Sequence, residues 1–142
     1  MAASKGKRRT IGETLEQITP EYLEERARRI TPVELSRVVD HAKDLDRRFA
    51  RAAPLKPHRE DARLLLGLLS DFHQGSFRAA SYRSIATIVT ALGYALHGDD
   101  LIDDKMPFVG ALDDAAVFAL CLDLVKRDLD AYRKWKKRAA KT

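Results

Sequence analysis

Apolar residues recur along this chain with the period of an α-helix rather than the alternation of a β-strand. Between residues 31 and 52 they return every three or four positions, which places them on one helical face. These positions are Leu35, Val38, Ala42, Leu45, Phe49 and Ala52. Thr31 and Glu34 have the spacing of a capping box. The pattern predicts a helix packed in a core; a coiled-coil contact with another chain is the alternative.

The same reasoning predicts four further helices. One begins at Thr19-Pro20, one runs over 58–74 and stops at Gly75, and one follows a connector over 76–81 and ends near His97. The helix ending near His97 is apolar nearly all round, but its uncharged run over 84–98 is shorter than the roughly 18–20 residues that span a bilayer. The last helix opens near Asp113 and continues towards Arg138.

The predicted fold class is therefore all-α. It is a single helical bundle of about five helices, with an acidic loop between the last two. Residues 1–12 are polar, basic and aperiodic, so they are predicted to form a disordered basic arm. Residues 13–57 hold the N-terminal helices, and residues 58–142 form a helical domain that contains the acidic loop.

The composition of the chain indicates its net charge and its expected cellular location. The chain has 142 residues, a formal net charge of +5 and one cysteine, Cys121, which lies between two leucines. A lone cysteine excludes an intramolecular disulfide and favours a reducing, cytoplasmic location, with Cys121 as a small buried hydrophobe. No apolar run follows the basic N-terminus, so a secretory signal is not expected.

The acidic loop over 98–114 is the most unusual stretch. Six aspartates crowd into it, and crowded carboxylates raise one another's pKa values unless something offsets the repulsion. Helix capping is one explanation, with Asp100 capping a short turn and Asp113 or Asp114 capping the last helix. A divalent cation such as Mg²⁺, Ca²⁺ or Mn²⁺ is the alternative, with candidate ligands Asp100, Asp104, Asp113 and Asp114. A surface on which a partner protein docks is the third explanation.

The loop also carries a family resemblance. The stretch from Ala95 to Asp104, followed by Met106 to Ala115, resembles the signature of the YkvA-like family, a group of small helical domains of unknown function. The positions that match the family motif are Asp100, Leu101, Ile102, Asp104, Pro107, Gly110, Leu112, Asp113 and Asp114. Gly98 and Asp103 stand where the family has prolines. The resemblance covers roughly residues 61–135, which makes 58–142 the YkvA-like domain and leaves 13–57 outside it.

The resemblance implies possible peripheral association with a membrane and no enzymatic activity. The residues themselves offer no catalytic set, because no nucleophile has a spaced base. Three functions stay open: a protein-interaction or scaffold module with an unknown protein partner, a divalent-metal-binding domain built on the acidic loop, and a binder of anionic membrane or nucleic acid. The binder would use the basic ends of the chain, residues 5–9 and 133–141, with Tyr132 and Trp135 interleaved in the second.

Overall fold

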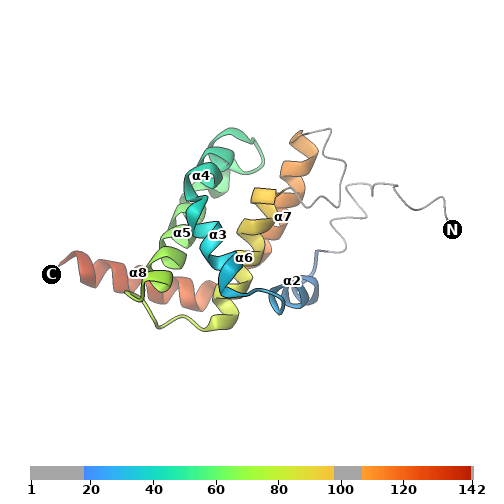
Figure 1. The fold of residues 1–142 in the computed structure, drawn as a ribbon. Coiled ribbons are helices and arrows are strands. Elements are labelled where there is room, and N and C mark those ends of the chain that lie inside the picture. The colour runs from blue at the N-terminus through green and yellow to red at the C-terminus, as the bar shows by residue number, and fades with distance from the viewer. Residues whose placement is uncertain (1–17, 98–106, 142) are drawn as a thin grey trace.

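The computed structural model of the protein describes residues 18–97 and 107–141. These residues form seven α-helices and one short 3₁₀ helix, with no strand among them, so the all-α prediction is confirmed (Figure 1). The helices are α2 (Pro20–Ala27), α3 (Pro32–Asp40), α4 (Ala42–Arg51), the 3₁₀ helix η2 (Lys56–His58), α5 (Arg59–Gln74), α6 (Tyr82–His97), α7 (Pro107–Leu124) and α8 (Lys126–Ala140). The predicted disordered arm and residues 98–106 of the acidic loop lie outside the described ranges.

The predicted number of about five helices is wrong in detail, because two of the expected helices are each divided by one residue. His41, with φ −104° and ψ 22°, separates α3 from α4. Val125, with φ −106° and ψ 12°, separates α7 from α8. A single non-helical residue redirects the helix axis without shifting the spacing of the apolar positions. Periodicity therefore predicts continuous helices across both breaks.

The local signals that predicted helix ends act as expected. The hydroxyl of Thr19 accepts a hydrogen bond from the Tyr22 N–H at 3.1 Å and caps α2. Thr31 and Glu34 form a full capping box at the start of α3. Gly75 closes α5 with φ at 86°, in the left-handed region that favours glycine. The ends of these helices follow from their own sequences.

Helix α6 is the centre of the bundle, as its nearly uniform apolar surface predicts. It packs against α7, α2 and α3 (Figure 1). Its residues from Ile85 to Leu92 are all buried. The same core contains apolar residues from both sides of residue 57. One example is Phe49 of α4, whose ring meets that of Phe118 of α7 edge-on with centroids 5.0 Å apart. Within the described ranges, no helix is both long enough and apolar enough to cross a membrane.

Candidate functional site

Asp113 and Asp114, the paired aspartates of the family motif, lie in the interior rather than on the surface. Their exposures are 0% and 1%. Asp113 accepts a hydrogen bond from the hydroxyl of Tyr94 on α6, with an oxygen–oxygen distance of 2.7 Å. Asp114 forms an ion pair with Arg48 of α4. Two guanidinium nitrogens of Arg48 donate to one carboxylate oxygen of Asp114, and the Arg48 Nε lies 3.2 Å from it. Two adjacent residues of α7 thus link this helix to two others, α6 and α4.

The expectation that Asp113 or Asp114 caps the last helix is wrong. Helix α7 begins at Pro107, six residues before Asp113, so both aspartates lie in its second turn. Backbone N–H groups beyond the first turn already donate to carbonyls four residues earlier and have no need of a cap. The charge of Asp114 is instead offset by a guanidinium, and Asp113 is stabilised by a hydroxyl donor.

Tyr94 and Arg48 were not singled out in the sequence. They lie 19 and 66 positions from their aspartates, and Arg48 sits in the segment before the family resemblance. Burial and the hydrogen bond to Asp113 raise the pKa of Tyr94 far above its ordinary value, so its hydroxyl stays protonated and donates. No local sequence pattern marks either partner. Only the helical register, which places Arg48 three positions after the buried Leu45, gives a hint.

The structure describes only some of the remaining motif positions. Asp100, Leu101, Ile102 and Asp104 lie outside the described residues, and Leu112 is half-buried on α7. Pro107 is the first residue of α7 and Gly110 lies within its first turn. No group of three or more potential metal ligands occurs in the described part of the chain. The metal site, half of whose candidate ligands lie outside that part, stays a prediction.

Cys121 is the small buried hydrophobe that its flanking leucines indicate. It is fully buried on α7, and its thiol lies 3.9 Å from the backbone carbonyl of Thr87 on α6. Burial raises the pKa of the Cys121 thiol to about 12. The reactive thiolate is therefore scarce near neutral pH.

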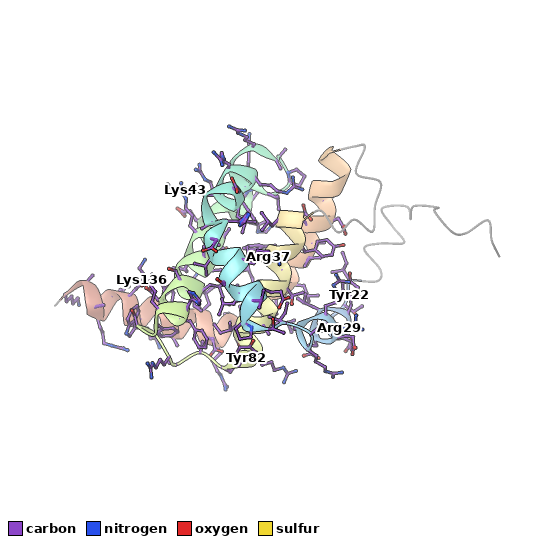
Figure 2. All side chains as sticks on the ribbon, viewed as in Figure 1. Tyr22, Arg29, Arg37, Lys43, Tyr82 and Lys136 are labelled. Carbon is purple, nitrogen blue, oxygen red and sulfur yellow. The ribbon has the colours of Figure 1, made fainter. Side chains whose placement is uncertain are left out.

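The outer face of α8 carries a stripe of exposed cations, which we call the basic stripe. It consists of Lys126, Arg127, Lys134, Lys137 and Arg138 of α8, together with Lys141 directly after the helix. None of the six forms an ion pair with a described residue. Arg133, by contrast, pairs with both Asp61 and Asp130. The C-terminal part of α8 projects beyond the other helices, and Lys136 extends from it (Figure 2). The basic stripe is thus open to a large anionic partner.

The aromatic residues of α8 face the other way. The ring of Tyr132 is buried, and its hydroxyl donates to Asp71 of α5 at 2.6 Å. Trp135 stacks on Tyr132 with centroids 5.8 Å apart and also contacts Phe77 at 5.3 Å. The sequence suggested that these aromatics share a contact surface with the basic residues. They instead anchor α8 to the bundle and hold the basic stripe outward.

Comparison with known proteins shows which family part of the chain matches. Residues 84–120, from α6 into α7, match the family described as "Protein of unknown function (DUF1232)". The chain is also 30% identical, over 69 residues, to the "Uncharacterized membrane protein YkvA" of Bacillus subtilis (strain 168). The resemblance to the YkvA-like family is confirmed over this part of the chain. The second match covers 49% of this chain and 65% of that relative, just under two thirds of its length. No solved structure matches the chain.

Proposed function

We propose that this protein is a non-enzymatic helical module that associates peripherally with an anionic membrane surface through the basic stripe of α8. The observation that carries the proposal is the set of six exposed cations on one helical face, with no ion pair to a described residue. Lysines and arginines of a folded surface commonly find local carboxylates. Leaving six of them open along one helix creates a positive surface suited to a flat anionic partner.

The expected strength is modest and reversible. Each lysine or arginine close to an anionic bilayer contributes about 1 kcal/mol. Three simultaneous contacts would thus contribute about 3 kcal/mol, a partition advantage of roughly 150-fold over a neutral surface. Because Tyr132 and Trp135 pack inward, insertion of these two rings adds nothing, and binding by α8 is governed by charge. The predicted cytoplasmic location would place the stripe opposite the leaflet that is rich in anionic lipid.

A membrane fits this surface better than a single-stranded nucleic acid does. Binding of single strands commonly relies on aromatic side chains on which bases stack, and the aromatics of α8 are packed against the bundle. A protein similar to this chain is named a membrane protein. Both points support a lipid surface as the partner.

Vesicle flotation tests the proposal. The protein should float with vesicles of phosphatidylcholine containing phosphatidylserine, stay behind with pure phosphatidylcholine, and be released as the salt concentration rises. Binding to duplex DNA with no vesicle binding would reassign the stripe to nucleic acid. The scaffold role with a protein partner also stays a prediction, and failure of both anionic surfaces would favour it.

A further inference from the structure

The connector between α5 and α6 runs along one side of α8. The ring of Phe77 lies 5.2 Å from that of Tyr132 and 5.3 Å from that of Trp135, measured between centroids. At the other end of the connector, the backbone N–H and the hydroxyl of Ser81 both donate to the carboxylate of Asp128, at 3.2 and 3.3 Å. The connector and α8 are therefore antiparallel neighbours, and the start of α6 lies beside the first turn of α8.

Two exposed apolar side chains lie at this end of α8. Among the described residues, the large apolar side chains that are exposed are Val33, Tyr82 and Leu124. Tyr82 directly follows Ser81 and is 47% exposed, and Leu124, at 37%, ends α7 two residues before α8 begins. Single exposed apolar residues are ordinary on a protein surface. Here, however, two from different helices lie at the start of the basic stripe.

The ring of Tyr82 is only loosely held by the protein. Its hydroxyl donates to the Ile30 carbonyl over 3.4 Å, which is a long and weak hydrogen bond. Figure 2 shows Tyr82 at the lower end of the bundle, where α8 begins, whereas Lys43 of α4 is at the upper end. The ring can therefore meet a surface that lies against α8 without disturbing the core.

Arg78 adds a cation to the same edge of the molecule. It is exposed in the connector, directly after Phe77, and its Nε donates to the Gly75 carbonyl at 3.2 Å. It forms no ion pair with a described residue. The surface beside α8 is thus positive as well as apolar. This combination suits the boundary of a bilayer, where anionic headgroups lie just outside the acyl chains.

We propose that Tyr82 and Leu124 are interfacial anchors, which enter the headgroup region of the membrane when the basic stripe binds it. This inference rests on the proposed function and extends it, because it specifies which end of α8 lies deepest. The rings of α8 itself are held against the bundle, so apolar contact with lipid has to come from neighbouring elements. Tyrosine suits this position, since its ring favours apolar surroundings while its hydroxyl stays hydrated among the headgroups.

Vesicle flotation across a salt series separates the anchors from the basic stripe. Attraction between exposed cations and anionic lipid is screened as salt rises, whereas the transfer of an apolar side chain out of water is not. Tyr82→Ser should lower partition on phosphatidylserine-containing vesicles by roughly fivefold at every salt concentration, and Leu124→Ser by a similar factor. Tyr82→Phe keeps the ring and should stay within about twofold of wild type. Neutralising the basic stripe should instead have an effect that shrinks as salt rises.

Fluorescence quenching locates the anchor directly. In a Trp135→Phe background, Tyr82→Trp places the single tryptophan of the chain at the expected contact, where vesicles containing brominated phosphatidylcholine should quench it. Lys43→Trp in the same background places it at the other end of the bundle, where fluorescence should be unchanged (Figure 2). Circular dichroism checks that each variant is folded. The serine variants retain Trp135, so the salt series does not depend on this background.

The outcomes distinguish the anchors from the proposed function. A salt-independent loss in the serine variants, with quenching at position 82 and not at position 43, would support the anchors. Wild-type binding that both serine variants retain in full, with equal quenching at the two positions, would overturn the anchors and leave the role of the basic stripe intact. Absence of wild-type binding to the anionic vesicles would overturn both.

Discussion

The aspartates of the family motif show how far residue-level reasoning reaches. Their position beside Pro107 and Gly110 suggests a loop followed by a helix cap, because turn residues and acidic residues commonly mark a helix start. In the structure they lie inside α7 and contact Tyr94 and Arg48. Side chains so far apart in sequence meet only because α4 and α6 pack against α7. Tertiary packing therefore decides the role of these carboxylates, and local pattern cannot.

The Tyr94–Asp113 hydrogen bond should contribute measurably to stability. Tyr94→Phe removes a buried donor from a carboxylate and should lower the free energy of unfolding by about 1–3 kcal/mol in urea denaturation. Tyr82→Phe is the matched control, because its hydroxyl lies 3.4 Å from the Ile30 carbonyl and the residue is 47% exposed. Its effect should stay within about 0.5 kcal/mol. Equal effects of the two variants would contradict a structural role for this bond.

Arg48 should matter more than its half-exposed position suggests. Arg48→Ala leaves the Asp114 carboxylate in the interior without its guanidinium, which should cost about 2–3 kcal/mol, less than for a fully buried pair. The control Arg51→Ala removes an arginine from an exposed position of the same helix, with an expected cost within about 0.5 kcal/mol. Chemical denaturation monitored by circular dichroism measures both. A cost for Arg48→Ala no larger than that of the control would show that the pair is unimportant.

At the scale of elements, apolar periodicity and capping signals predict which segments are helical. They identify α2, α5 and α6 well, including the capping threonine and the glycine stop. They miss the breaks at His41 and Val125 because neither position carries proline or glycine. The early start of α7 is missed for the opposite reason, since Pro107 and Gly110 are typical of a turn. Proline also suits the first position of a helix, and that is the role it takes here.

The contact between α5 and α8 depends on Gly67. A Cβ atom at this position would lie 2.9 Å from the Tyr132 hydroxyl, which is already held by Asp71. Gly67→Ala should therefore be destabilising, whereas Gly93→Ala, with no atom near its new methyl, should gain from helix propensity. We expect the two variants to differ in unfolding free energy by about 1–3 kcal/mol. A stabilising Gly67→Ala would show that Tyr132 is loosely held.

The junction of α4 and α5 should weaken in acid. Asp46 of α4 accepts hydrogen bonds from Arg59 and Arg63 of α5, at distances of 2.9–3.1 Å. These bonds lower the pKa of Asp46 well below its ordinary 3.8. A carboxylate with a lowered pKa stabilises the fold above its unfolded-state pKa and loses that contribution as pH falls further.

Wild type should therefore be more stable than Asp46→Asn by about 1 kcal/mol at neutral pH. This difference should begin to shrink as the pH falls below the ordinary pKa of 3.8, and it should keep shrinking towards the lowered pKa of the folded state. Urea midpoints across the pH range measure this gap. Asp44→Asn is the control, because the partner of Asp44 is Arg47 on its own helix. A gap that does not change with pH would contradict the assignment of Asp46.

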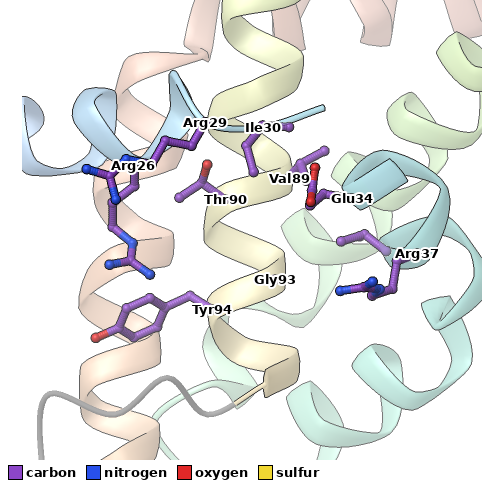
Figure 3. Close-up of a pocket in the computed structure, with 10 residues that line it drawn as sticks. Arg26, Arg29, Ile30, Glu34, Arg37, Val89, Thr90, Gly93 and Tyr94 are labelled. Atoms are coloured by element: carbon purple, nitrogen blue, oxygen red, sulfur yellow. The ribbon is translucent and has the colours of Figure 1, made fainter. Parts of the chain in front are cut away.

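At the scale of the whole molecule, the chain is a helical bundle with positive charge on two separate surfaces. The basic stripe follows α8, and a cleft among α2, α3 and α6 is lined by Arg26, Arg29 and Arg37 (Figure 3). Composition indicated an excess of positive charge, but the two surfaces follow from the packing. The stripe faces outward because Leu129, Tyr132 and Trp135 hold the opposite side of α8 against the bundle. The central claim is that this surface binds anionic membrane.

The most direct test is the partition coefficient on phosphatidylserine-containing vesicles for two variants of equal net charge. Lys134→Gln/Lys137→Gln/Arg138→Gln neutralises half of the basic stripe. Lys43→Gln/Arg51→Gln/Lys56→Gln removes three exposed cations from α4 and η2. We predict that the stripe variant loses roughly 150-fold in partition, at about 1 kcal/mol for each cation, while the other stays within about threefold of wild type. Equal losses in the two variants would contradict the account, because binding would then depend on net charge rather than on α8.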